Sequence, residues 1–130
     1  MFRILDEYKP YGHWLLRIAL ALVFIVHGLA NIMDSTGFAA GLHVPVVVGI
    51  VLALMEIGGG VLVILGGFAE DWMTRFGALL LLPVVLVTIF TVHLGSSGLS
   101  LARAHIVGGM ELSIVLFLIA LFVLLKGNKA

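Results

Sequence analysis

The sequence contains no cysteine and few charged residues, and both absences limit what the protein can do. Without cysteine there can be no disulfides, thiolate metal sites, iron–sulfur clusters or dithiol relays, so any redox role requires a bound cofactor. Only 11% of the 130 residues are charged, whereas a soluble domain averages about 25%. Seven basic and seven acidic residues cancel, with no basic run and no acidic tail, so nothing supports nucleic acid as a partner.

Apolar side chains, by contrast, are abundant: 62% of the residues are hydrophobic and the mean hydropathy is +1.27. One core in so short a chain cannot bury this much apolar surface, so the surrounding solvent must be lipid. Four apolar segments, each long enough to cross a membrane, lie at 13–33, 45–66, 74–94 and 105–125. We therefore predict an all-α fold, a four-helix transmembrane bundle, with residues 1–130 as a single integral membrane domain and no separate soluble catalytic domain.

Basic residues near the helix ends predict the orientation, because Lys and Arg resist translocation more than acidic residues do. The leader before the first segment carries Asp6 and Glu7 and lacks a clean cleavage site, so we expect this segment to be retained rather than removed as a signal peptide. Arg103 is the only basic residue expected on one side. Those expected on the other side are Arg3, Lys9, Arg75, Lys126 and Lys129. Both termini should therefore be cytoplasmic, with the connectors 34–44 and 95–104 outside.

Glycine and proline punctuate the predicted spans. Gly58-Gly59-Gly60 follows no strand and so resembles no phosphate-binding loop; in lipid, such small residues let helices approach closely. Pro45 falls at the first turn of the second span, where its missing amide hydrogen costs nothing. Pro83 falls in the middle of the third span, where we expect a kink that frees the carbonyl of Leu79.

Ionisable residues inside a membrane helix are costly, and they mark a pathway, a cofactor site or a structural pair. Arg17, His27 and Asn31 share an arc of about 80° on the first span, and Glu56 lies near the middle of the second. Glu111, in the fourth span, is expected at nearly the level of His27, roughly 6 Å to the outer side of the centre. We expect a polar column that opens outward.

The column allows several interpretations. Arg17 could extend toward Glu56 or snorkel to the cytoplasmic surface. His27, together with His93 or His105 near the outer boundary, could ligate haem or a metal ion. The carboxylates and imidazoles could also relay protons or bind a quinone headgroup, and a buried His–Glu pair could simply fasten helices together. No tight ligand motif such as His-x-x-x-His decides between them, and no self-contained catalytic motif is present.

Two stretches resemble the DoxX family of small four-helix membrane proteins, which includes membrane subunits associated with thiosulfate:quinone oxidoreductase. The first comprises Arg17-Ile18-Ala19-Leu20 and His27-Gly28-Leu29-Ala30-Asn31; the second comprises Met55-Glu56-Ile57-Gly58-Gly59-Gly60 and Leu65-Gly66-Gly67-Phe68. Family members commonly carry a lysine after the His-Gly step, where this chain has Asn31.

The resemblance implies a membrane subunit of a quinone-linked oxidoreductase in a bacterial inner membrane, working with another protein subunit or as a homo-oligomer. The residues assigned to the quinone or proton site are Arg17, His27, Asn31, Glu56 and Glu111. The alternatives are a haem- or metal-binding protein that uses His27, His93 and His105, and a non-catalytic anchoring or assembly subunit.

Overall fold

The computed structural model describes residues 2–94 and 108–129, and every regular element in these ranges is helical. The elements follow one another as α1 (Arg3–Asp6), η1 (Lys9–Tyr11), α2 (Gly12–Met33), α3 (Ser35–Leu42), α4 (Val46–Phe68), α5 (Asp71–Thr88), η2 (Ile89–Leu94), α6 (Gly108–Lys126) and η4 (Gly127–Lys129). Four of the described helical stretches are long and apolar enough to cross a membrane, at Lys9–Met33, Val46–Phe68, Asp71–Thr91 and Glu111–Lys129. The predicted four-helix transmembrane fold is confirmed.

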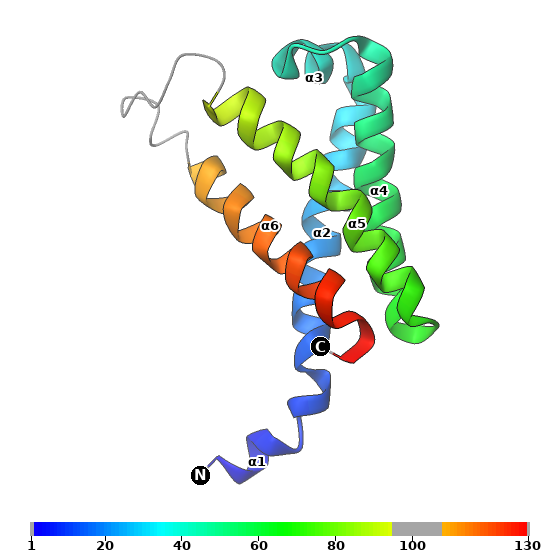
Figure 1. Ribbon diagram of the computed structural model, residues 1–130, viewed down its shortest axis with the longest axis vertical. Coiled ribbons are helices and arrows are strands. Elements are labelled where there is room, and N and C mark those ends of the chain that lie inside the picture. Colours follow the sequence, from blue (N-terminus) through cyan, green and yellow to red (C-terminus); the bar gives the residue numbers. More distant parts are fainter. Residues whose placement is uncertain (1, 95–107, 130) are drawn as a thin grey trace.

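The four long helices pack side by side in their order along the chain: α2 against α4, α4 against α5, and α5 against α6 (Figure 1). The two termini lie at the same end of the bundle, and α3 lies at the opposite end (Figure 1). The core that joins the four helices includes Phe24 of α2, Val63 of α4, Leu81 of α5 and Leu116 of α6. The contact between α2 and α6 is much less extensive than the other three, and this leaves space between those two helices.

The connector between the first two spans is a helix rather than the loop that its turn-rich start, Asp34 to Gly37, suggests. The side chain of Asp34 caps α3 by accepting a hydrogen bond from the backbone N–H of Gly37 at 3.1 Å. His43 ends α3 in the left-handed conformation, at φ 57°, and Pro45 immediately precedes α4. The same four residues that signal a turn therefore start a short helix that packs against α4.

Glycines bring the helix backbones into close contact, as the sequence predicts. A methyl group added at Gly59 of α4 would lie 2.9 Å from the carbonyl oxygen of Gly77 in α5, and one added at Gly60 would lie 3.3 Å from that of Ala21 in α2. Gly58 points in another direction from the helix axis and has no neighbour within 4 Å of an added methyl group. The glycines of α4 therefore serve helix packing, with Gly58 as an exception.

Pro83 lies inside α5, which continues to Thr88 and then passes into the π-helical turn η2. In this region the hydroxyl of Thr88 donates to the carbonyl of Val84 at 3.0 Å, and the hydroxyl of Thr91 donates to that of Val87 at 2.6 Å. Each hydroxyl donates to a backbone carbonyl four residues earlier, so these polar groups find hydrogen-bond partners within the helix, which lipid cannot supply.

Candidate intramembrane site

The polar residues of the spans form two separate clusters rather than the single column expected from the sequence. One surrounds Glu56 in the middle of α4, and the other surrounds Arg17 near the end of the bundle that carries the termini. No hydrogen bond or ion pair among the described residues joins Arg17 to Glu56. The two clusters differ in character, because the first borders a cavity while the second is filled by protein groups.

Glu56 is held by a hydrogen bond from the neighbouring helix. The side-chain amide of Asn31 in α2 donates to Oε2 of Glu56 at 2.7 Å, and Glu56 is only 5% exposed. Gly28 makes this contact possible: a methyl group at that position would lie 3.0 Å from both the Glu56 Cβ and the Ala53 carbonyl oxygen. The absence of a side chain at Gly28 thus brings α2 close enough for Asn31, one turn later, to reach the carboxylate.

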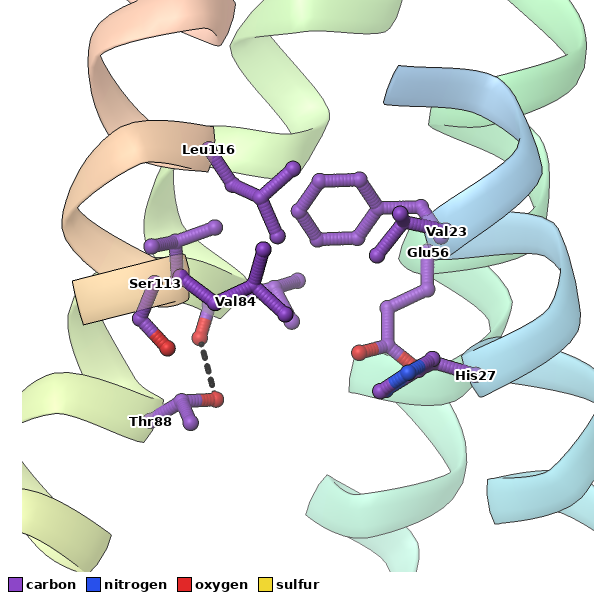
Figure 2. A pocket seen from close by; sticks show the side chains of 10 residues that line it. Val23, His27, Glu56, Val84, Thr88, Ser113 and Leu116 are labelled. Atoms are coloured by element: carbon purple, nitrogen blue, oxygen red, sulfur yellow. Dashed lines mark hydrogen bonds between the residues drawn. The ribbon is translucent and has the colours of Figure 1, made fainter. Parts of the chain in front are cut away.

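A pocket of about 190 Å³ lies beside this pair and draws its walls from all four long helices (Figure 2). Glu56 and His27 stand on the α2 and α4 side, while Thr88 of α5 and Ser113 of α6 stand on the opposite side (Figure 2). The rest of the lining is apolar, from Val23, Phe24, Val84, Val85, Leu112 and Leu116. An apolar chamber with polar groups on two opposite walls is the usual form of a small-ligand site.

His27 is exposed although it lines the pocket, so the pocket reaches the surface of the bundle at this residue. His27 lies within the first membrane span. The opening at His27 therefore faces the interior of the membrane, and a ligand could enter sideways from lipid.

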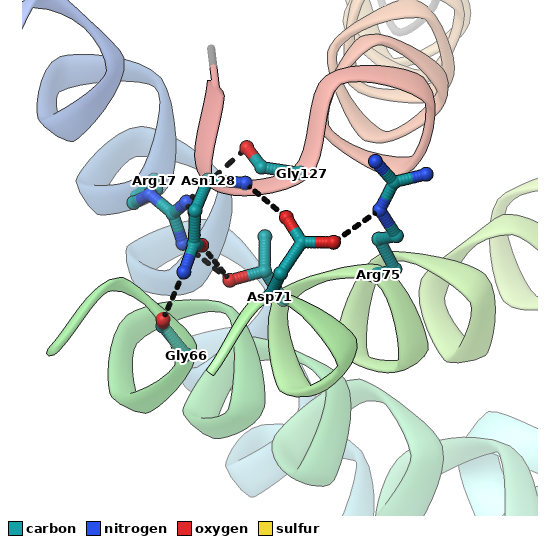
Figure 3. Close-up of polar contacts among 7 residues, drawn as sticks. Arg17, Gly66, Asp71, Arg75, Gly127 and Asn128 are labelled. Atoms are coloured by element: carbon teal, nitrogen blue, oxygen red, sulfur yellow. Dashed lines mark hydrogen bonds and ion pairs between the residues drawn. The ribbon is translucent and has the colours of Figure 1, made fainter. Parts of the chain in front are cut away.

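Arg17 is 1% exposed, and each of its five N–H groups has an acceptor, of which Figure 3 shows those on Gly127 and Asn128. Nε donates to His13 Nδ1 at 3.0 Å, and Nη1 donates to the Val63 carbonyl at 2.7 Å and to Thr74 Oγ1 at 2.8 Å. Nη2 donates to the Gly127 carbonyl at 3.4 Å and to Asn128 Oδ1 at 2.8 Å. Arg17 therefore neither reaches Glu56 nor snorkels to the surface; both alternatives left open by the sequence are wrong.

The C-terminal turn closes this cluster. Gly127 has a left-handed φ of 58°, and the residue after it, Asn128, accepts from Thr74 Oγ1 at 2.7 Å and donates its side-chain amide to the Gly66 carbonyl at 2.9 Å. The backbone N–H of Asn128 donates to Asp71 Oδ1 at 2.6 Å, and Asp71 is also ion-paired with Arg75 at 2.6 Å (Figure 3). The Arg17 cluster thus ties α2, α4, α5 and the C-terminus together, which is a structural function.

The remaining predicted site residues are Glu111, His93 and His105. Glu111 is exposed at the start of α6, does not line the pocket and forms no hydrogen bond with His27 in the described ranges. His105 lies outside the described residues, as does the side chain of His93. No group of three His, Asp or Glu side chains close enough to hold a metal ion occurs among the residues that the structure describes.

Sequence reasoning missed four polar residues that contribute to these clusters: Thr74 and Asn128 beside Arg17, and Thr88 and Ser113 across the pocket from Glu56. A hydroxyl or amide in an apolar span is a detectable signal, but uncharged polar groups are cheap enough to occur singly without a role. Their partners are far away in sequence, 57 residues for Arg17 and Thr74 and 111 for Arg17 and Asn128. Only the folded bundle identifies the pairs.

Four packed apolar helices with a mainly apolar pocket between them, lined by a few polar groups, define a small integral membrane protein. Residues 12–94 match the DoxX family, and this chain belongs to it. A Haemophilus influenzae protein described as "Uncharacterized protein" is 31% identical over 130 residues, which cover 97% of this chain and 90% of that protein. The Bacillus subtilis protein named "Putative oxidoreductase CatD" is 29% identical over 121 residues, covering 91% of this chain and 81% of that protein. No solved structure matches the chain.

Proposed function

We propose that the protein is a membrane subunit of a quinone-linked oxidoreductase and that the pocket beside Glu56 receives the quinone headgroup. The observation that carries the proposal is the placement of polar groups on two opposite walls of a small apolar chamber, Glu56 and His27 on one side and Thr88 and Ser113 on the other (Figure 2). A para-quinone ring carries its two oxygens at opposite ends and is apolar between them. His27 can donate to a ring oxygen, while Thr88, whose hydroxyl donates to the Val84 carbonyl, offers an acceptor that suits the hydroxyl of the reduced ring.

The size of the pocket favours a single ring. A cavity of about 150 Å³ is enough for benzene, so a pocket of about 190 Å³ accommodates one substituted ring. A haem macrocycle is several times larger. The haem or metal alternative would use His27, His93 and His105, and of these His105 and the side chain of His93 lie outside the described residues.

The residues around the pocket have distinct roles in this proposal. His27 orients a ring oxygen by hydrogen bonding. Reduction of a quinone to a quinol takes up two electrons and two protons, and Glu56 is the ionisable group placed to pass protons to or from the ring. Asn31 is a positioning residue, since its amide fixes one carboxylate oxygen of Glu56 and leaves the other toward the chamber. Arg17 and Glu111 lie outside the pocket lining and have no part in the headgroup site.

The electrons must come from a bound cofactor or from a redox group on a partner, because this chain lacks cysteine and so has no thiol or iron–sulfur chemistry of its own. Of these two sources we propose a second protein subunit as the electron donor, in a bacterial inner membrane with both termini of this chain in the cytoplasm. The relative named an oxidoreductase and the bacterial origin of both relatives support this setting.

The experiment is a binding titration with quinones of one ring, using protein purified in mild detergent. Glu56→Gln removes the ionisable group but keeps the shape and the acceptor for Asn31, so it should lower turnover by the assembled enzyme at least tenfold while the melting temperature stays within a few degrees. Glu7→Gln, the same change at an exposed glutamate near the N-terminus, is the matched control and should behave as the wild type. If the purified protein binds no quinone and Glu56→Gln leaves turnover intact, the proposal is wrong.

A further inference from the structure

A second concave surface lies on the outside of the bundle, in the space between α2 and α6. It is a groove of about 310 Å³ lined by Leu16 of α2 and by Val115, Leu118, Ile119 and Phe122 of α6. All five lining side chains are hydrocarbon. Nothing in the groove can hydrogen-bond a ligand, so it fits only an apolar chain or ring.

The groove and the headgroup pocket are separate hollows that lie along the same faces of α2 and α6. On α2, Leu16 of the groove and Val23 and His27 of the pocket fall within an arc of about 40°. On α6, Leu112 of the pocket lies one turn before Val115 of the groove, and Ile119 follows one turn later. A chain attached to a ring in the pocket would therefore reach the groove by following these faces of α2 and α6, without crossing a helix.

The distance between the pocket and the groove also points to a flexible chain. From His27 to Leu16 the path along α2 is eleven residues, or about 16 Å, and runs toward the end of the bundle that carries the termini. Exposed side chains border it: Val115 is 50% exposed, Leu118 56% and Phe122 40%. The groove is thus open on its lipid side along its length, as a surface that holds a long tail must be.

We propose that the groove between α2 and α6 holds the prenyl tail of a lipid quinone whose ring occupies the pocket. This assignment rests on the proposed function and narrows it, because it names the ligand as a membrane-resident quinone with a tail rather than a short, water-soluble quinone. Lipid tails are as apolar as the groove. The favourable free energy of binding the tail therefore comes from van der Waals packing of the chain against two helices, and not from its removal from water.

The test compares two probes that carry the same benzoquinone ring, one with a ten-carbon tail and one with only a methyl group in its place. Leu118→Trp fills the groove from α6, and Leu16→Trp fills it from α2. Leu125→Trp is the matched control, since Leu125 is 67% exposed on α6 and lies outside the groove. Leu118 and Leu125 are both exposed, so neither substitution disturbs the core, and a melting curve for each variant verifies this.

We expect Leu118→Trp and Leu16→Trp to weaken binding of the tailed ring about tenfold and to leave the methyl ring unchanged, with Leu125→Trp like the wild type for both. Equal affinity of the filled variants for the tailed ring would overturn the groove assignment while leaving the pocket proposal standing. If neither ring binds the wild type, the proposed function fails and the groove assignment fails with it. These results are distinguishable because the methyl ring reports on the pocket alone.

Discussion

The side chain of Asn128 accepts a hydrogen bond from the guanidinium of Arg17 at 2.8 Å, and this contact joins residues 111 positions apart. Through it the last turn of the chain is attached to the first membrane span. The arginine that the sequence presents as a candidate site residue is instead surrounded by protein acceptors from three other elements, α4, α5 and η4. Its removal should therefore affect the stability of the bundle more than ligand binding.

Arg17→Met should lower the free energy of unfolding by about 3 kcal/mol, because it leaves several buried acceptors without a donor. Arg17→Lys should restore only part of the loss, since one ammonium nitrogen with three donors cannot replace the planar fork with five. The measurement is the melting temperature of detergent-purified protein, followed by size-exclusion chromatography.

Asn128→Leu provides a second approach to the same cluster. It removes the acceptor for Arg17 and Thr74 together with the donor to Gly66, so we expect a loss of about 2 kcal/mol. Lys129→Ala, at the exposed neighbouring residue, is the control and should melt like the wild type. A wild-type melting temperature for both Arg17→Met and Asn128→Leu would contradict the structural role of the cluster.

Adjacent glycines in α4 should respond oppositely to alanine. Gly59→Ala places a methyl group 2.6 Å from the Leu81 side chain and 2.9 Å from the backbone oxygen of Gly77, so α4 and α5 must move apart at a cost of about 2 kcal/mol. Gly58→Ala meets nothing within 4 Å and should be neutral or stabilising by up to about 1 kcal/mol. Melting curves of the two variants, measured side by side, check both expectations; equal destabilisation would show that helix contact at Gly59 is not the cause.

His27 should contribute a hydrogen bond to the headgroup in the proposed site. His27→Leu should weaken binding of a single-ring quinone about tenfold, which corresponds to one lost hydrogen bond. His27→Gln keeps a donor of similar reach and should retain most of the affinity. A titration of each variant measures its affinity for the quinone. A loss of affinity in His27→Gln as large as in His27→Leu would mean that the imidazole itself is required, as it is in the alternative in which His27 ligates haem or a metal ion.

The absence of native cysteine makes the orientation simple to test. Thr36→Cys places a single thiol on exposed α3, and Lys129→Cys places one at the opposite end of the bundle. If both termini are cytoplasmic, a membrane-impermeant maleimide added to intact bacterial cells should label the first variant and not the second. Both should react once the membrane is opened, which serves as the control, and the reverse pattern in intact cells would invert the proposed topology.

The sequence by itself determined that this is a membrane protein of four helices. Apolar runs of about 20 residues have one way to satisfy their backbone groups in lipid, so composition and length suffice. The sequence likewise indicated that Gly58, Gly59 and Gly60 serve helix contact, since small residues let helices approach in lipid, and this holds for Gly59 and Gly60 but not for Gly58. A short connector is different: Asp34 to Gly37 suit a turn and a helix cap equally well, and packing of α3 on α4 decides between them.

Only the tertiary structure decided which polar groups meet. Helical periodicity places Arg17, His27 and Asn31 on one side of α2, but it cannot say how far each lies from residues of another helix. Because α2 approaches α4 closely at Gly28, the side chain of Asn31 can hydrogen-bond Glu56. Because the C-terminal turn packs against the start of the bundle, the side chain of Asn128 can hydrogen-bond Arg17. Which residues become partners depends on the rotation and the axial offset of whole helices. Contacts between small residues across the bundle set both, and no local pattern in the chain contains this information.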